Sequence, residues 1–249
     1  MQKVYRVVAI AAVLLSGSRP ASAQSADEII EKHLTATGGR AALSKLTSRK
    51  ATGAITVGTP VGDLMGTIEV YAKAPNKSRT LIKVDLSSVG GGQVVNDQRF
   101  DGNTGYVIDT FNGDREITGS QLEAMRTGGA FPTALLNYRE RGAQVTLASP
   151  EKVGGRDAYV IVMTPKAGPS ARVFIDTESL MLVKTVLTVN VPQLGGDIEQ
   201  VVEFSDFREV DGIKLPYTTK STNPAQTVTA TLTDVAHNVE IDDKSFLRP

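Results

Sequence analysis

Two histidines, His33 and His237, are the side chains of this sequence best suited to metal binding or acid–base chemistry near neutral pH. The chain has no cysteine, and the carboxylates near the two histidines do not follow a metal-ligand spacing. Because a zinc site takes about three protein ligands or more, we expect no metal and no cofactor. We interpret His33, beside the apolar face of a predicted helix, as a partly buried structural residue, and His237 as a solvated one.

Motifs that place a nucleophile or hold a phosphate are missing as well. No serine lies in a Gly-x-Ser-x-Gly elbow, and the glycine pairs precede no helix with a phosphate-binding pattern. The acidic pair Asp27-Glu28 falls in a first helical turn, where it offsets the helix dipole, and Asp242-Asp243 lies in the C-terminal tail. The sequence therefore predicts a protein that is not an enzyme.

The charge balance argues against nucleic acid as a partner. The chain has 27 basic and 27 acidic side chains, and without residues 1–23 it has 24 basic and 27 acidic ones. No run of lysine and arginine occurs. Because affinity for phosphate backbones comes mainly from clustered basic residues, we expect no nucleic-acid partner.

The N-terminus has the organisation of a signal peptide. It contains two basic residues, Lys3 and Arg6, an apolar run over 7–15, and the cleavage pattern Ala21-Ser22-Ala23, which places the mature start near Gln24. The apolar run is too short for a membrane-spanning helix, which needs about 20 residues. Since no cysteine is available for disulfides or for lipoprotein acylation, we expect a periplasmic protein exported through a cleaved signal peptide.

The rest of the chain, 24–249, is predicted to form one domain made mostly of strands. A helix over 25–37 begins with a capping box of Ser25 and Glu28. Alternating apolar residues then predict twelve strands, and the short turns between them make neighbouring strands antiparallel. The predicted strands cover 49–57, 64–73, 78–86, 93–100, 104–110, 144–153, 156–164, 170–176, 180–190, 197–207, 213–220 and 226–238.

One helical segment, over 118–141, interrupts the strands. Ser120 and Glu123 repeat the capping-box spacing, and apolar residues follow at helical intervals. Gly128-Gly129 and Pro132 divide the segment, so that it is predicted to form two short helices.

Two predicted strands, over 158–163 and 180–189, are apolar on both faces. A strand buried on both faces needs cover on each side. Helices and loops can provide all of that cover, or a bound apolar ligand or a dimer contact can provide part of it. Alternation separates the two faces of a strand without indicating which one faces a cavity.

The order of elements and three stretches of sequence resemble the periplasmic lipoprotein-carrier superfamily (LolA/LolB/LppX-like), in its outer membrane lipoprotein-sorting protein-like branch. The stretches are VGGRDAYVIVM, FIDTESLMLVK and FSDFREVDGIKLPY, and the resemblance covers nearly all of 26–249. It implies a mainly β fold, in which one curved antiparallel sheet of about 11–12 strands forms an unclosed half-barrel. An N-terminal helix and the helical insert would cover the concave face.

The resemblance also implies a function. Members of that superfamily carry acyl chains or other lipids between sheet and helices, with the insert as a lid. The expected partner is a lipid or an acylated protein, and an envelope membrane protein is a possible second partner. The lid would span 118–138, and candidate ligand-binding residues are assigned to the lid (Met125, Phe131, Leu135, Leu136) and to the wall (Val160, Val162, Val183, Val189).

Two other functions remain open at this point. One is a non-enzymatic interaction or sensory module of the cell envelope that uses the same fold. The other is a hydrolase that acts on a lipid or an envelope polymer, for which the sequence offers no motif.

Overall fold

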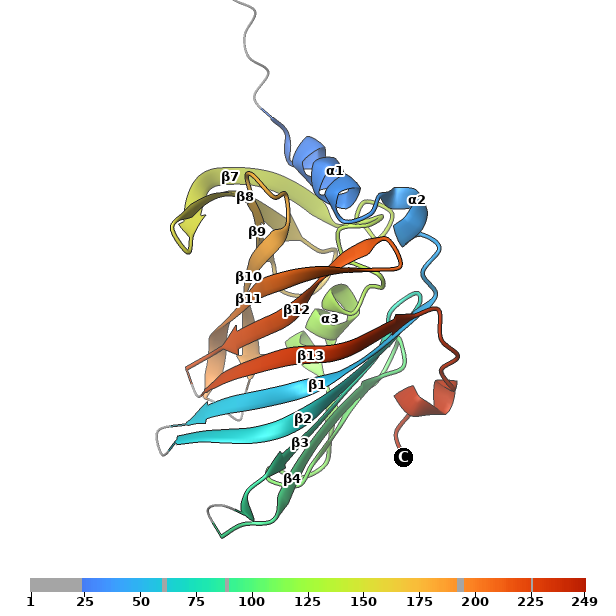
Figure 1. Ribbon diagram of the computed structural model, residues 1–249, viewed down its shortest axis with the longest axis vertical. Coiled ribbons are helices and arrows are strands. Elements are labelled where there is room, and N and C mark those ends of the chain that lie inside the picture. Colours follow the sequence, from blue (N-terminus) through green and yellow to red (C-terminus); the bar gives the residue numbers. More distant parts are fainter. Residues whose placement is uncertain (1–23, 60–61, 88–89, 192–194, 225) are drawn as a thin grey trace, which may run out of the picture.

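The computed structural model describes residues 24–59, 62–87, 90–191, 195–224 and 226–249 (Figure 1). The segment predicted to be a signal peptide lies outside these residues. The helices are α1 (Ala26–Ala36), α2 (Arg40–Leu43), α3 (Gly119–Gly128) and the 3-10 helix η3 (Asp243–Phe246). In the described part of the chain, no helix has the length and apolar character needed to cross a membrane.

Thirteen strands form a single antiparallel sheet, in the order β6-β5-β4-β3-β2-β1-β13-β12-β11-β10-β9-β8-β7. The strands are β1 (Ser48–Thr59), β2 (Gly62–Lys73), β3 (Lys77–Asp85), β4 (Gln93–Phe100), β5 (Gly105–Asp109), β6 (Arg115–Ile117), β7 (Gln144–Val153), β8 (Arg156–Thr164), β9 (Ala171–Asp176), β10 (Leu182–Val191), β11 (Gly196–Val210), β12 (Ile213–Thr222) and β13 (Thr227–His237).

Strand β1 lies in the middle of this sheet, and later strands form both of its edges. Strands β1 to β6 run outward to one edge, and β7 to β13 return from the opposite edge until β13 lies beside β1. The two edge strands, β6 and β7, are therefore consecutive in the sequence. The segment that joins them, 118–143, must cross one face of the sheet, and α3 lies inside the curve of the sheet (Figure 1). We call this segment the insert.

The predicted fold class is confirmed, with one unclosed antiparallel sheet, an N-terminal helix and a helical insert on the concave face. The sheet has one strand more than predicted, because β6 has only three residues and is too short to show alternation. The predicted second helix of the insert is wrong. Beyond α3 the insert forms turns, and Asn137 has a φ of 56°, a left-handed conformation that a right-handed helix does not accommodate.

The two predicted capping boxes have different outcomes. At α1, Ser25 and Glu28 form both reciprocal hydrogen bonds, as predicted. At α3 the prediction is wrong, since the N-cap is Thr118 and no side chain caps the helix. Ser120 Oγ instead accepts a hydrogen bond from the backbone N–H of Asn190 on β10, at 3.2 Å, and so connects the insert to the sheet.

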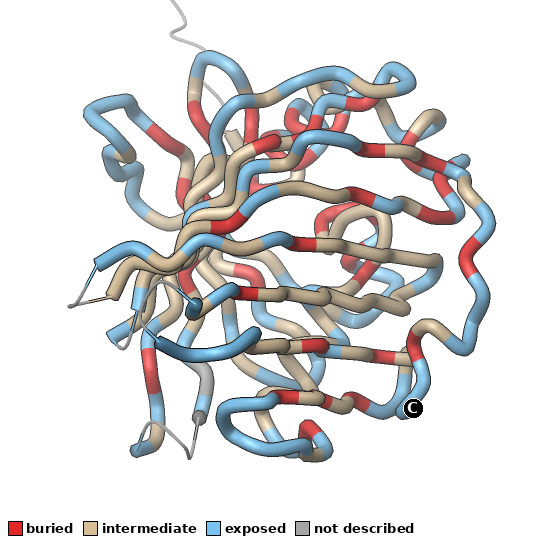
Figure 2. Tube along the Cα trace, turned by 60° about the horizontal axis from the view of Figure 1, so that its bottom comes forward, coloured by how far each residue is buried: buried red, intermediate tan, exposed pale blue. Residues whose placement is uncertain are grey.

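Helix α1 closes one end of the concave face. Its side chains Ile29, Ile30 and Leu34 are fully buried, and they pack in one cluster with Ile161 and Ile175 of the sheet. Each such side chain contributes about 1.5–3 kcal/mol through burial. Buried positions recur along the strands while the hairpin ends are exposed (Figure 2). Packing therefore fixes α1 firmly against the strands that form the cavity described next.

Candidate ligand cavity

A cavity of about 410 Å³ lies between the insert and the concave face of the sheet. Residues of the insert between Ala124 and Leu135 form one side, and β8 to β12 form the other. Most of the lining side chains are apolar, Leu187 and Phe204 among them. Both the volume and the apolar lining are typical of small-molecule sites, which measure roughly 300–1,000 Å³.

Two rows of cross-strand neighbours form the sheet side of the cavity. Met163, Ala171 and Leu187 are register partners on β8, β9 and β10, and all three line the cavity. Val173 and Thr185 form a second row. Because cross-strand partners project from the same face of a sheet, these rows identify the face that lines the cavity.

The valines assigned to the wall from the sequence lie on the other face of the same strands. Val160 and Val162 alternate with Ile161 and the cavity-lining Met163 of β8, and their register partners are Phe174 and Arg172. Val160 is fully buried in a separate cluster with Phe174, and Val183 packs against that cluster. The structure therefore places these three valines away from the cavity.

The other assigned residues are spread over the insert and β10. Leu135 lines the cavity and is also buried in the core, and Leu136 is buried beside it. Met125 lies on α3 and Phe131 in the following loop, and neither borders the cavity. Val189 lies on β10, but its side chain falls outside the described residues.

One partly buried cation, Arg49, lines the cavity from β1. Arg49 Nε donates a hydrogen bond to Nε2 of His237 on β13, at 3.1 Å. Its guanidinium carbon lies 5.4 Å from the ring centroid of Phe131, which belongs to the insert. Burial lowers the pKa of Arg49 to about 10, so the side chain is still charged at neutral pH. No carboxylate forms an ion pair with Arg49 in the described part of the chain.

The prediction that His237 is solvated is wrong, because its side chain is fully buried. Since Nε2 accepts from Arg49, the proton is on Nδ1, which faces Asp211 Oδ2 at 3.3 Å without the geometry of a hydrogen bond. Burial and the charge of Arg49 lower the pKa of His237, and Asp211 opposes them only in part. His237 is therefore a neutral acceptor for Arg49.

The predicted burial of His33 is confirmed, and its side chain also lines the cavity. His33 is buried, and its Nδ1–H donates to the backbone oxygen of Leu180, at 2.8 Å. Burial lowers the pKa of His33, so this hydrogen bond joins α1 to the turn between β9 and β10 with a neutral ring. Among the described residues, no group of three or more His, Asp or Glu side chains is arranged to hold a metal ion.

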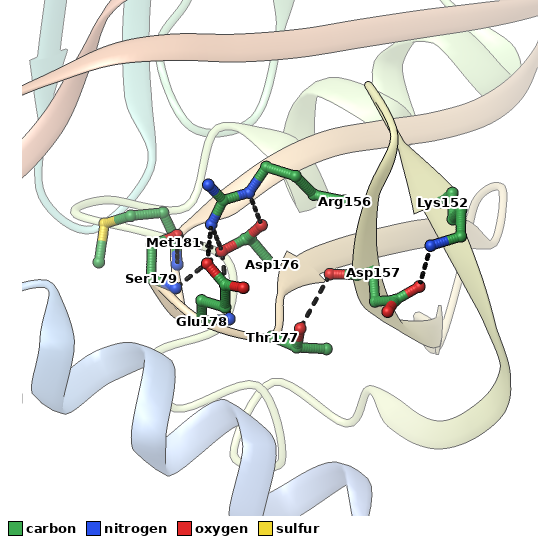
Figure 3. Close-up of polar contacts among 8 residues, drawn as sticks. All are labelled: Lys152, Arg156, Asp157, Asp176, Thr177, Glu178, Ser179 and Met181. Carbon is green, nitrogen blue, oxygen red and sulfur yellow. Dashed lines mark hydrogen bonds and ion pairs between the residues drawn. The ribbon is translucent and has the colours of Figure 1, made fainter.

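That turn is shaped by one buried carboxylate, Asp176 (Figure 3). Asp176 accepts hydrogen bonds from the backbone N–H groups of Glu178 and Ser179 and from Arg156. The hydrogen bond from Arg156 lowers the pKa of Asp176 far below its usual range, although burial opposes the shift. The stretch FIDTESLMLVK thus encodes a turn that places Met181 at the cavity.

Comparison with solved structures connects this architecture to known proteins. A domain designated an outer membrane lipoprotein-sorting protein, from Vibrio parahaemolyticus, has a TM-score of 0.55 at 12% identity, covering 88% of this chain and 95% of that chain. A LolA superfamily protein from Nitrosomonas europaea has a TM-score of 0.56 at 14% identity, covering 91% of this chain and 99% of that chain. The chain has the LolA-like fold.

A third match is a DUF1329 family protein from Desulfovibrio piger, with a TM-score of 0.54 at 14% identity, covering 88% of this chain and 97% of that chain. No family model matches the sequence, and neither does any curated protein. At these identities the likeness concerns the fold alone, and the LolA-like fold agrees with the resemblance noted in the sequence.

Proposed function

We propose that this protein is a periplasmic carrier or binding protein for a lipid, an acyl chain or the acyl chain of a lipoprotein. The observation that carries the proposal is the apolar cavity of about 410 Å³ between insert and sheet. Each methylene removed from water contributes about 0.8 kcal/mol, so about ten methylenes supply about 8 kcal/mol before the costs of binding. One chain is therefore enough for useful affinity.

The proposed binding residues are the two cross-strand rows on the sheet and Leu135 on the insert. Binding of this kind needs no nucleophile or general base. The two histidines already have structural partners, since His33 is bonded to a backbone oxygen and His237 to Arg49. We therefore propose binding without catalysis. The names of the Vibrio and Nitrosomonas structures support the proposal by analogy of fold alone.

Native mass spectrometry of protein purified from a periplasm without detergent tests the proposal. We expect a stoichiometric adduct of lipid mass. Ala171→Trp should abolish the adduct, because the indole would fill the cavity from the row between Met163 and Leu187. Val162→Trp is the matched control, since Val162 lies on the opposite face of the sheet and is partly exposed.

The control also distinguishes the wall residues assigned from the sequence, such as Val162, from the cross-strand rows that line the cavity in the structure. Loss of the adduct in Val162→Trp and its retention in Ala171→Trp would contradict the proposed site. A protein that is free of lipid and takes up no added fatty acid or phospholipid would contradict the function itself. That result would leave the interaction module, which a stoichiometric envelope partner bound by lipid-free protein would then support.

A further inference from the structure

The charged side chains that line the cavity all carry the same sign. Arg49 and Lys214 are lining residues, and no Asp or Glu of the described chain is. Lys214 is exposed at the rim, where water screens its charge. Arg49 is less exposed than Lys214, and its ring partner Phe131 comes from the loop that follows α3. The cavity is therefore apolar along most of its wall and positive at one place.

Among the residues that the structure describes, no acidic side chain forms an ion pair with Arg49. Its one hydrogen bond to a protein acceptor in the described chain goes to His237, which is neutral, so that bond leaves the charge uncompensated. The nearest acid in this chain of contacts is Asp211, which faces His237 rather than Arg49 and is itself 66% exposed. Buried charges elsewhere in proteins are normally paired, because burial of an isolated charge is costly.

Other buried charges of this protein follow that rule. Asp97 accepts hydrogen bonds from both Arg79 and Arg99 at 2.8 Å, and Asp176 accepts from Arg156. Arg49, which is partly buried, has no such ionic partner among the described residues, and it lines the cavity. A guanidinium group matches carboxylate and phosphate oxygens, with two parallel N–H donors for two oxygens.

We propose that Arg49 binds the anionic head group, a carboxylate or a phosphate, of a single-chain amphiphile whose acyl chain fills the cavity. The head group forms the ion pair with Arg49 that no acidic side chain of the described residues forms. The acyl chain contacts the cross-strand rows of Met163 and Val173. This inference rests on the proposed function, because it adds a polar end to the proposed apolar site. It assigns selectivity for charged over neutral lipids to one residue.

Three ligands with the same twelve-carbon chain test the inference, namely dodecanoate, dodecyl phosphate and dodecanol. Their dissociation constants are measured by isothermal titration calorimetry at pH 8, below the micellar concentrations. We expect at least one anion to bind the unaltered protein about tenfold more tightly than dodecanol, as a charge-assisted hydrogen bond provides. Arg49→Gln should remove that preference and leave the affinity for dodecanol unchanged.

Arg172→Gln is the matched control. Arg172 also lies over a phenylalanine ring, at 5.0 Å from the centroid of Phe174, but on the face of the sheet opposite to the cavity. We expect this variant to keep the preference for the anion. If Arg49→Gln does not fold, the comparison of the three ligands on the unaltered protein still tests the inference.

The outcomes distinguish this inference from the proposed function. Equal affinity for the anions and dodecanol, or an anion preference that survives in Arg49→Gln, would overturn the role of Arg49 while the apolar carrier stands. Binding of none of the three ligands would overturn both. A preference for dodecyl phosphate over dodecanoate, lost in Arg49→Gln, would support the inference and identify phosphate as the head group.

Discussion

Asp97 and Asp176 show how the sheet accommodates buried charge. Both side chains are 4% exposed, and each is bonded to at least one arginine. Burial by itself would raise the pKa of Asp97, but hydrogen bonds from Arg79 and Arg99 lower it overall. Paired acids of this kind are structural, whereas the cavity residue Arg49 has no such partner. Asp97 and Asp176, which are paired with arginines, therefore stabilise the fold, whereas we propose that Arg49 pairs with a ligand.

The role of Asp176 can be measured through stability. Asp176→Ala removes the acceptor for Ser179, Glu178 and Arg156, and should lower the free energy of unfolding by about 2–3 kcal/mol in urea titrations. Asp157→Ala is the control in the same region of Figure 3. It removes a carboxylate that is 64% exposed and pairs with Lys152, so the expected change is within about 0.5 kcal/mol.

The pH dependence of the free energy of unfolding gives a second test of Asp176. Because the pKa of Asp176 is lowered in the folded state, its contribution is present above the ordinary value of about 3.9 and is lost as the pH falls below it. The stability of the unaltered protein should therefore fall more steeply below pH 4 than that of Asp176→Ala. Parallel curves would show that Asp176 does not stabilise the turn as a carboxylate.

At the scale of elements, local patterns predicted most of what the structure contains. Apolar runs between turn residues, over 156–164 and 170–176, predicted β8 and β9, and Ser25 and Glu28 predicted the start of α1. Such signals are local, so one sequence is enough to find them. The spacing of Ser120 and Glu123 was the same signal, yet Ser120 bonds to β10 instead, because a tertiary contact competes with the local cap.

The choice of face could not be made from the sequence. Val160 and Met163 belong to one apolar strand, and both are buried, one in the cluster with Phe174 and one at the cavity. A strand covered on both faces has no polar face to mark the solvent side. The face that lines the cavity depends on where the insert lies, and the insert contacts strands that are distant from it in sequence.

The contact between Ser120 and Asn190 gives a test of the insert as a lid. Ser120→Ala removes the hydrogen bond that joins α3 to β10. If the insert acts as a lid, we expect this variant to release bound dodecanoate about two- to tenfold faster in a chase experiment, as the loss of one hydrogen bond provides.

Ser120→Thr is the control for that experiment, since it keeps the hydroxyl group, and it should release its ligand at the unaltered rate. Unchanged release from Ser120→Ala would mean that the ligand leaves by a route other than displacement of α3. The lid interpretation would then be rejected, and the cavity would remain the binding site.

At the scale of the molecule, the edges of the sheet are poor templates for further strands. Edge strand β6 has three residues. The opposite edge, β7, contains Pro150 and a register shift between Ala148 and Glu151, and most of its residues are exposed. Proline, bulges and charge are the devices by which proteins avoid edge pairing. This arrangement favours ligand uptake inside the sheet over partner binding at its edges.

Export of the whole molecule is a further prediction. Protein recovered from the periplasm should begin at Gln24, as measured by intact mass and N-terminal sequencing, because Ala21-Ser22-Ala23 matches the cleavage pattern. Ala23→Tyr should leave a longer, uncleaved form, since the cleavage site takes small residues. Recovery of chains that still contain residues 1–23 from the unaltered protein would contradict the prediction.

The pairing of β1 with β13 makes the order of synthesis matter. Arg49 and His237 are bonded across this seam although they are 188 residues apart, whereas the other strand pairs join near neighbours in sequence. Pairing of such distant segments is slow, and β13 is the last strand to leave the ribosome. A nascent chain of this protein therefore stays unfinished until nearly its end has been made. That delay also postpones the contact that holds Arg49, a residue of the cavity lining, beside His237 until β13 has been synthesised.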